Sequence, residues 1–228
     1  MTALRQRMVE DMELRGFSAN TQKSYLRAVR LLAEYYGKSP DQITEEELRD
    51  YFLYLKNEKG SARSTITVAL CAIKFFSTHT LRRPWPVLGF VRPKPEKKLP
   101  VVLSVEEVHR ILGCLRKPRY RVCLGTIYAC GLRLGEGVNL QVPNIDSSRM
   151  VIHVRHAKGG KDRYVPLPES SLKMLREYWA THHNPKWLFP VNPGEGQSLV
   201  SVDAPMSAQA VAQAFRAAAK KSGVLKHA

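Results

Sequence analysis

The sequence predicts a mainly α-helical protein with one small antiparallel β-sheet, arranged as two units joined by a basic, proline-rich linker. Three observations lead to this prediction. Apolar residues recur at three-to-four spacing through most of the chain, which is typical of amphipathic helices. Five prolines fall within residues 84–100, which suits an extended connection better than a core element. Two short segments, MVIHVR and DRYVPL, flank the sequence AKGGK and indicate a hairpin with a glycine-containing turn.

Four helices are predicted in the first unit, residues 1–83. The first covers residues 3–15 and stops before Gly16, and the second begins near Ser18 and ends at Gly37. The third opens at residues 44–47 with a capping box, in which a threonine and a glutamate side chain satisfy each other's backbone donors. The fourth covers about residues 64–78.

The second of these helices separates apolar from cationic residues. One stripe at helical spacing consists of Tyr25, Val29, Leu32 and Tyr36. The opposite side carries Lys23, Arg27 and Arg30. Such a face can contact phosphate groups, but it is also compatible with an ordinary solvated surface, so on its own it leaves both interpretations open.

The second unit is predicted to cover residues 103–228, after a linker over residues 84–102. A second capping box at residues 104–107 opens a helix with one apolar stripe, formed by Val108, Ile111, Leu112 and Leu115. The next helix, residues 120–130, is predicted to be apolar all round and buried on every side. A short helix follows up to Leu140. After the hairpin, two further helices are expected over residues 168–182 and 207–222.

The charge of the chain restricts its partners. It has 36 Lys and Arg residues against 20 Asp and Glu, which gives a formal net charge of +16 and favours a polyanion such as nucleic acid. A membrane surface is not favoured, because there is no long apolar run and no basic amphipathic tail. The N-terminus lacks the apolar core of a signal peptide, and the four cysteines lack CxxC pairing. We therefore expect a cytoplasmic protein with reduced, buried thiols.

One arginine stands out in the segment YACGLRLGEGVNL, residues 128–140. Arg133 follows an almost wholly apolar stretch, and an arginine side chain keeps its charge wherever it is placed. It therefore needs an anionic partner or solvent. One interpretation is an internal ion pair with Glu136, three residues later. The other is that Arg133 points into a cleft and binds a phosphate group.

The hairpin turn offers a similar choice. Lys158 and Lys161 lie on the predicted turn, where lysines are often only solvated and discourage edge-to-edge pairing. The segment is not a P-loop, because Asp162 stands where a serine or threonine would bind magnesium. The segment GLRLGEG also fails to match the dinucleotide-binding pattern GxGxxG.

Together these motifs resemble the tyrosine recombinase family of phage and integron integrases and chromosome-dimer resolvases. The resemblance covers nearly the whole chain. In the second unit it rests on Gly131-Leu132-Arg133, Glu136, Leu140, Ile145-Asp146, the run Lys158-Gly159-Gly160-Lys161-Asp162-Arg163, and Val165-Pro166-Leu167. In the first unit, Gly16-Phe17-Ser18 with Thr21 and Tyr25 resembles the opening of that family's four-helix DNA-clamping domain.

The resemblance implies a SAM-like core-binding domain followed by an incomplete α+β integrase catalytic domain. In that family a tyrosine attacks a DNA phosphate, leaving a 3′-phosphotyrosyl bond and a free 5′-hydroxyl, with neither metal nor ATP as a cofactor. By resemblance Arg133 would clamp the scissile phosphate, Lys158 would protonate the leaving 5′-oxygen, and Glu136 would support the arginine. The expected partners are double-stranded DNA and other recombinase subunits in a tetrameric synapse. The cations expected to contact DNA are Lys23, Arg27, Arg30, Lys94, Lys97, Lys98, Lys161 and Arg163.

The sequence also departs from the family pattern. A His-x-x-Arg motif and the nucleophilic tyrosine are not found after Lys158, so we expect the chain as given to be unable to cleave DNA. Two alternatives to an incomplete recombinase remain: a DNA-binding module that occupies recombination sites without cutting, and a generic basic protein that binds RNA, for example. The tetrapeptide at residues 79–82 spells His-x-x-Arg but precedes Arg133, and Tyr164 and Tyr178 come too early to be the nucleophile. Gly137 is unfavourable inside a helix by about 1 kcal/mol relative to alanine.

Overall fold

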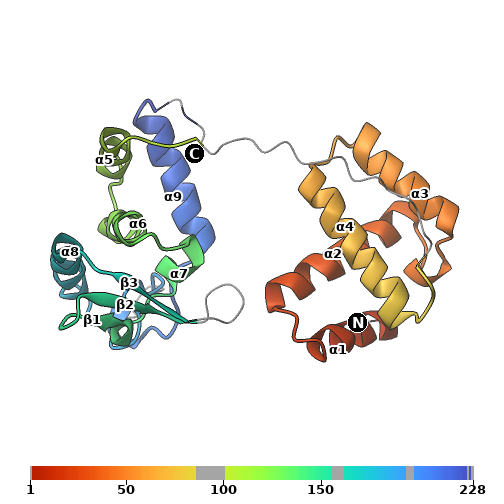
Figure 1. Cartoon of the computed structure of the whole chain (residues 1–228), viewed down its shortest axis with the longest axis horizontal. Helices are drawn as coiled ribbons and strands as arrows, with labels where there is room; N and C mark the ends of the chain where they lie inside the picture. The colour runs from red at the N-terminus through yellow and green to blue at the C-terminus, as the bar shows by residue number, and fades with distance from the viewer. Residues whose placement is uncertain (1, 86–100, 156–161, 194–197, 225, 227–228) are drawn as a thin grey trace. The chain divides into compact units, whose positions relative to one another are not determined.

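The structure is a computed structural model that describes residues 2–85, 101–155, 162–193, 198–224 and 226 (Figure 1). The chain divides into two compact units, residues 1–95 and 96–228. Each unit has its own buried core and is described by itself. The predicted fold class, mainly α-helical with a small antiparallel sheet, is confirmed.

The N-terminal unit is built from α1 (Ala3–Glu13), α2 (Ala19–Tyr36), α3 (Glu45–Leu53) and α4 (Arg63–Phe75). Their ends follow local chemistry. The side chain of Ser18 accepts a hydrogen bond from the backbone at the start of α2, and Gly37 ends this helix with a φ of +63°. The predicted capping box of Thr44 and Glu47 opens α3. The fourth helix is shorter than predicted, because residues 76–80 continue as a wider π-type turn.

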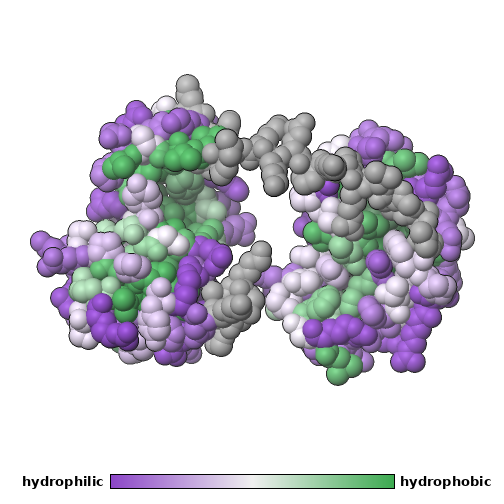
Figure 2. All heavy atoms as spheres, in the orientation of Figure 1, coloured by the Kyte–Doolittle hydropathy of each residue, from purple (hydrophilic) through white to green (hydrophobic). Residues whose placement is uncertain are grey.

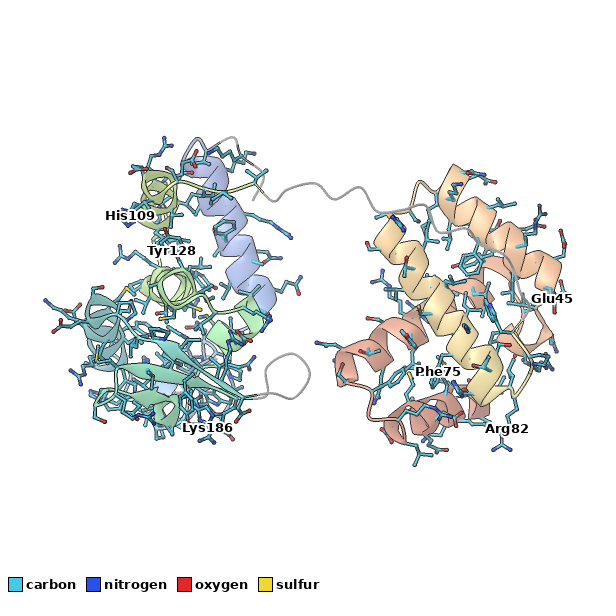
Figure 3. The ribbon with its side chains drawn as sticks, in the orientation of Figure 1. Glu45, Phe75, Arg82, His109, Tyr128 and Lys186 are labelled. Carbon is cyan, nitrogen blue, oxygen red and sulfur yellow. The ribbon has the colours of Figure 1, made fainter. Side chains whose placement is uncertain are left out.

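The core of the N-terminal unit lies mainly between α2 and α4. Leu32 of α2 is 1% exposed, and Ala72 and Ile73 of α4 are buried with it. A second cluster joins α1 to the end of α4 through Met8, Met12 and Phe75, and Figure 3 places Phe75 within this unit. The predicted apolar stripe of α2 therefore faces inward, and the cations of its other side are exposed.

The C-terminal unit combines helices with a three-stranded sheet. Its helices are α5 (Val105–Gly113), α6 (Pro118–Cys130), α7 (Leu134–Val138), α8 (Glu169–Trp179) and α9 (Ala208–Lys221). The sheet has the order β1 (Ile145–Asp146), β2 (Val151–Val154) and β3 (Arg163–Pro166), with both pairings antiparallel. In the centre of the sheet, Ile152 lies opposite Ile145 on one side and Val165 on the other. The two longer strands match the predicted hairpin, whereas the sequence did not predict β1.

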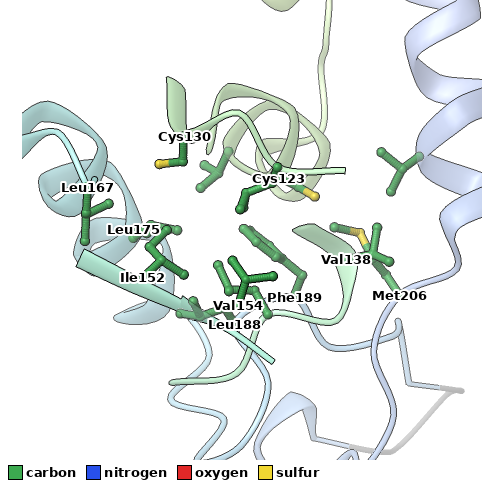
Figure 4. Packing of buried hydrophobic residues seen from close by; sticks show 14 of the residues in the cluster. Cys123, Cys130, Val138, Ile152, Val154, Leu167, Leu175, Leu188, Phe189 and Met206 are labelled. Carbon is green, nitrogen blue, oxygen red and sulfur yellow. The ribbon is translucent and has the colours of Figure 1, made fainter. Parts of the chain in front are cut away.

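One apolar cluster joins the sheet to the helices of this unit. Phe189 is fully buried at its centre, with Cys123 of α6 on one side and Val154 of β2 on the other (Figure 4). Burial raises the pKa of the Cys123 thiol to about 12, so this cysteine is a neutral core residue at ordinary pH. A smaller cluster packs α9 against α5 through Ile111 and Ala218.

The prediction that helix 120–130 is buried on every side is wrong. Val122, Cys123, Thr126 and Cys130 of α6 are buried, but Ala129 is exposed and Tyr128, which projects from α6 in Figure 3, is 50% exposed. Only part of the circumference of α6 is covered by the described residues, so one side meets solvent. Hydrophobic residues also reach the surface around α5, where Val102 and Val105 are exposed (Figure 2).

The structure changes the interpretation of Gly137, which lies in α7 against α6. A Cβ atom added at this position would lie 2.3 Å from Cγ1 of Ile127, so the two helices are closer than any side chain at position 137 allows. The glycine is therefore required by packing, although it is unfavourable for the helix itself.

We predict that Gly137→Ala destabilises the protein by roughly 1–3 kcal/mol, because the cost of overpacking exceeds the gain in helix propensity. Urea unfolding followed by circular dichroism measures this change. Gly135→Ala is the matched control in the same helix, because a Cβ there has nothing within 4 Å. The control should be neutral or slightly stabilising. A stabilised Gly137→Ala variant would contradict the proposed close approach of α6 and α7.

Candidate functional site

The backbone that carries Arg133 is fixed between two helices. Gly131 ends α6 in the left-handed conformation, with a φ of +62°, and the N–H of Leu132 donates to the carbonyl of Ile127 at 3.0 Å. Leu132 is 6% exposed, so its side chain anchors the junction in the core. Arg133 follows in an extended conformation directly before α7, and 59% of its side chain is exposed. The buried side chain of Leu132 thus fixes the position of the backbone that carries the exposed guanidinium of Arg133.

Glu136 joins two arginines that are far apart in the sequence. Its carboxylate, 10% exposed, accepts hydrogen bonds at 2.8 Å from Nη1 and from the backbone N–H of Arg133. It also accepts two parallel bonds at 2.8 Å from Nη1 and Nη2 of Arg163, on β3. The hydrogen bonds from Arg163, together with those from Arg133, lower the pKa of Glu136 to about 2. The three side chains carry a net charge of +1.

The internal ion pair of Arg133 with Glu136 is present in the structure, whereas phosphate binding by Arg133 stays a prediction. The ion pair uses only Nη1 of Arg133, whereas Nε and Nη2 make no hydrogen bond within the described residues. Those two groups remain available to an anion from solvent. Arg163, for which contact with DNA stays a prediction, directs two of its nitrogens to Glu136, and a third of its side chain is exposed.

A polar groove of about 610 Å³ opens beside Arg133. Besides Arg133 and Glu136, its wall includes Asn139, Gln141, Asn144, His153, Arg155 and Trp187. The segment after α7 pairs with the segment before Phe189, since Val142 N–H donates to the carbonyl of Lys186 and Leu188 N–H donates to the carbonyl of Leu140. The groove therefore collects side chains from several parts of the C-terminal unit.

Asn184 holds the part of the groove that bears Trp187. It is fully buried, and its amide nitrogen donates to the carbonyls of Leu199 and Val202 at 2.8 and 2.9 Å. Its side-chain oxygen accepts from the backbone N–H of Trp187 at 2.7 Å. One buried amide thus fixes the turn by satisfying backbone groups that would otherwise lose their partners.

The described ends of the β2–β3 hairpin are tied by side chains. His153 on β2 lies 3.1 Å from a carboxylate oxygen of Asp162, and its Nδ1 accepts from Nε of Arg155 at 3.3 Å. The ring of His153 also stacks on Tyr164 of β3, with centroids 4.6 Å apart. Lys158 and Lys161, the predicted turn cations, lie outside the described residues, as do Lys94, Lys97 and Lys98 of the linker.

The structure also accounts for the remaining tyrosine and histidine motifs. Tyr164 is an exposed surface aromatic, and Tyr178 of α8 packs in the core against Phe189. The ring of His79 lies against that of Phe75 in a tilted arrangement, with centroids 4.9 Å apart, and its Nδ1 lies 3.0 Å from Nη2 of Arg15. His79 is therefore an exposed residue of the N-terminal unit that contacts Phe75 and Arg15.

The N-terminal unit presents its own cationic groove between α2 and α4. Arg27 and Lys59 lie on it together with the hydroxyl-bearing Ser24, Ser61, Ser64 and Thr65. Lys23, Arg27 and Arg30 are all exposed, and Arg30 pairs with Glu34 at 3.2 Å. Lys59, Ser61 and Ser64 were not predicted from the sequence as functional residues; they fall in the run KGSARST, which leads into the start of α4.

Two further observations concern other ligand classes. Among the described residues, no group of three or more His, Cys, Asp or Glu side chains lies close enough together to hold a metal ion. None of the described helices has the length and apolarity that crossing a bilayer requires.

Two family models together cover most of the chain. Residues 4–87 match the phage integrase N-terminal SAM-like domain, and residues 102–228 match the phage integrase family. A Sinorhizobium fredii protein that carries an integrase/recombinase name is 48% identical over 191 residues, which are 83% of this chain and 62% of that protein. The tyrosine recombinase XerD of Rhizobium meliloti is 29% identical, over 94% of this chain and 76% of the relative.

Solved structures show the same fold. The lambda integrase tetramer bound to a Holliday junction aligns with a TM-score of 0.70 at 14% identity, over 99% of this chain and 64% of that one. The chain spans about 60% of the length of the first curated relatives, 62% of one and 59% of the next.

We predict that Glu136→Gln lowers the free energy of unfolding at pH 7 by ~2 kcal/mol, since a neutral amide loses the charge-assisted bonds and leaves two cations together. Because the folded-state pKa of Glu136 lies near 2, below its ordinary value of 4.5, this stabilisation is fully present above pH 4.5. It is lost as the pH falls from 4.5 toward 2. Urea unfolding of both proteins at a series of pH values measures the difference.

The matched control is Glu46→Gln, which removes an exposed ion pair with Arg49 at 3.1 Å. Exposed pairs contribute little, so the control should leave the unfolding curve almost unchanged. A difference between wild type and Glu136→Gln that persists unchanged at pH 2 would argue against the carboxylate as the source of the stability.

Proposed function

Because this chain belongs to the phage integrase family of tyrosine recombinases, we propose that it binds duplex DNA and serves site-specific recombination or integration. The observation that carries this proposal is the exposed guanidinium of Arg133, held at a rigid helix junction by Glu136. The net charge of +16 and the cationic groove of the N-terminal unit agree with a DNA partner. Lambda integrase, whose fold this chain shares, is bound to a Holliday junction in its own structure.

In this proposal Arg133 contacts the scissile phosphate. The free Nε and Nη2 groups donate to a non-bridging oxygen, where negative charge develops as the phosphorus is attacked. One preorganised donor of this kind contributes roughly 3–4 kcal/mol to the stabilisation of a transition state. Lys158 is proposed to give a proton to the leaving 5′-oxygen, so that the broken P–O bond ends as a neutral hydroxyl. Glu136 acts through Arg133 and is a positioning residue.

DNA is proposed to contact residues 1–83 as well as residues 103–228, with residues 84–102 as the basic linker. Lys23, Arg27 and Arg30 are the proposed phosphate contacts of the first unit, to which the α2–α4 groove adds Lys59. Lys94, Lys97 and Lys98 of the linker and Lys161 of the hairpin turn are proposed as further contacts. Arg163 is proposed to support the site through Glu136 first, and to contact DNA only with its remaining donor.

A second candidate function is favoured by one observation. The 228 residues contain no His-x-x-Arg motif after Lys158, and the later tyrosines, Tyr164 and Tyr178, have structural roles. A polypeptide of these residues is therefore proposed to occupy recombination sites without cutting them. Cleavage by a longer protein and occupation by this polypeptide share the same DNA-binding surfaces. They differ only in the covalent step.

We expect the affinity of the chain for duplex DNA to fall steeply with salt, because cations that bind phosphate release the counterions of DNA. Fluorescence anisotropy with a labelled duplex at several salt concentrations gives the slope. Arg27→Ala should weaken binding and reduce the slope by about one. Arg49→Ala, an exposed arginine on α3, is the control and should leave both quantities unchanged.

Binding that is absent at low salt, or insensitive to salt, would contradict the DNA proposal.

Arg133→Ala should weaken DNA binding only mildly and leave the unfolding curve intact, because the guanidinium of Arg133 is exposed. A loss of the fold in this variant would instead assign Arg133 to an internal ion pair alone.

We expect no covalent protein–DNA adduct when residues 1–228 are incubated with a nicked suicide duplex. The reason is the lack of a tyrosine that could be placed against the phosphate by a second arginine. Denaturing gel electrophoresis with end-labelled DNA detects an adduct, and a complete tyrosine recombinase on its own site is the positive control. A denaturant-resistant band would disprove this expectation, and peptide mapping would then identify the tyrosine.

A further inference from the structure

The turn that follows α8 is held by the side chain of a buried histidine. His182 is 4% exposed, and its Nδ1 accepts a hydrogen bond from the backbone N–H of Asn184 at 3.1 Å. Between these two residues, His183 has a φ of +48°, a backbone conformation that residues other than glycine seldom adopt. The hydrogen bond from Asn184 to His182 therefore helps to hold a turn whose backbone conformation is unfavourable by itself.

This hydrogen bond requires one protonation state of the His182 ring. A backbone N–H only donates, so Nδ1 must be unprotonated, and the neutral ring carries its hydrogen on Nε2. In a protonated ring both nitrogens are donors, so an Nδ1–H group would face the N–H of Asn184. Nε2 is itself buried and has no hydrogen-bond partner among the described residues. The turn thus keeps its hydrogen bond only while His182 is neutral.

The titratable group that faces His182 from α8 is Tyr178. The two rings meet edge to face, with centroids 5.0 Å apart. Burial raises the pKa of Tyr178, so this side chain stays uncharged near neutral pH. Arg119 and Cys123 of α6 influence the pKa of Tyr178 but not that of His182. Tyr178 therefore adds no charge that could stabilise a protonated His182 ring.

The remaining surroundings of His182 also favour its neutral form. Burial lowers the pKa of His182 below its ordinary value of 6.5, and the charge of His183 acts in the same direction. The backbone carbonyl of Leu188 favours the protonated ring and opposes these two effects without cancelling them. No acidic side chain of the described residues contributes to the pKa of His182.

Asn184 connects His182 to the groove of the candidate site. Its side-chain oxygen accepts from the backbone N–H groups of Lys186, labelled in Figure 3, and Trp187 at 3.0 and 2.7 Å, and Trp187 lines that groove. The indole N–H of Trp179 donates to the carbonyl of Asn184 at 2.9 Å. Of the hydrogen bonds that hold Asn184, only the one from its backbone N–H has a titratable acceptor. Asn184 is thus the point at which a proton on His182 can act on the turn.

We propose that His182 is an acid-sensitive switch, in which protonation of the ring releases Asn184 and the turn that places Trp187 in the wall of the groove beside Arg133. A proton from solvent binds at Nδ1, the hydrogen bond from the Asn184 N–H is lost, and the charged ring moves from its buried position to solvent. In acid the groove loses its Trp187 wall, so a ligand that contacts Trp187 binds more weakly.

The pH range of the switch follows from linkage. Because the folded-state pKa of His182 lies below 6.5, the closed turn is fully stable above pH 6.5 and loses stability as the pH falls below that value. The switch goes beyond the proposed function, and its test contains no DNA. A failure of DNA binding therefore leaves it standing, and a failure of the switch leaves the DNA proposal standing.

The first measurement is an NMR titration of the 228-residue chain labelled with ¹⁵N, between pH 5 and 7.5. At pH 7.5 the ring of His182 should be neutral, with its hydrogen on Nε2 and none on Nδ1, and it should titrate below pH 6.5. A hydrogen on Nδ1 at pH 7.5, or a ring that is already charged there, would overturn the proposal.

Amide hydrogen exchange of the same chain measures the opening of the turn. The protection factors of the Lys186 and Trp187 amides should fall by about tenfold per pH unit below pH 6.5, because each opening takes up one proton. The amide of Cys123 in α6 reports unfolding of the whole unit and should keep its protection over this range. Protection of Lys186 and Trp187 that is independent of pH in wild type contradicts the switch.

His182→Asn is the decisive variant, because its side-chain oxygen lies near the position of Nδ1, accepts the same hydrogen bond and does not titrate. It should keep the turn closed and remove the pH dependence of Lys186 and Trp187. His183→Asn, at the exposed neighbour, is the matched control, since asparagine tolerates a positive φ, and it should behave like wild type.

Circular dichroism confirms that both variants are folded. A His182→Asn protein in which the protection of Lys186 and Trp187 falls with pH as in wild type would assign the pH dependence to another group and reject the proposal. If His182→Asn does not fold, the position of the ring hydrogen and the exchange of the wild-type amides decide the question by themselves.

Discussion

The carboxylate of Glu136 is the interaction on which the C-terminal site depends. A carboxylate that is only 10% exposed loses most of its hydration, and this loss must be offset by strong hydrogen bonds. Arg163 on β3 and Arg133 before α7 provide them. The same bonds keep two guanidinium groups near each other, which would otherwise repel. The sheet, the α6–α7 junction and the exposed edge of Arg133 are thereby held in one arrangement.

The rest of the site is positioned by packing in the core and by hydrogen bonds to the backbone. Gly131 turns the chain at the end of α6, and buried Leu132 fixes the junction in the core. The side chain of Asn184 bonds to the backbone N–H of Trp187, which also lines the groove, and to the carbonyl of Leu199. The elements that line the groove beside Arg133 are held in place by the apolar cluster around Phe189. Preorganisation of this kind holds the exposed guanidinium of Arg133 in one orientation.

Much of the fold could be predicted from the periodicity of apolar residues and from the capping residues at helix ends. The capping boxes at Thr44 and Ser104 and the two strands of the hairpin are local patterns, and the structure contains all of them. The two-residue strand β1 is too short for a periodic signal, and its existence depends on pairing with β2. The exposed side of α6 could not be predicted, because the burial of an apolar helix depends on which other elements pack against it, and its own sequence does not contain that information.

The candidate site was predictable only where its contacts are local in the sequence. Arg133 directly precedes α7 and Glu136 is its third residue, so their pairing follows from the geometry of a helix N-terminus. The role of Arg163 depends on how a strand is placed 27 residues later, and no local pattern contains that information. Trp187 and Arg155 reach the groove through tertiary pairing of distant segments, and no motif includes them.

The close approach of Gly137 to Ile127 also constrains how this sequence can change over time. The side chain of Ile127 occupies the space that a Cβ at position 137 would need, so the two positions share one volume. A larger residue at 137 becomes acceptable only after position 127 has become smaller, and a single change at 137 must pass through an overpacked intermediate. In related chains these two positions should therefore vary together, with the order of substitutions fixed by volume.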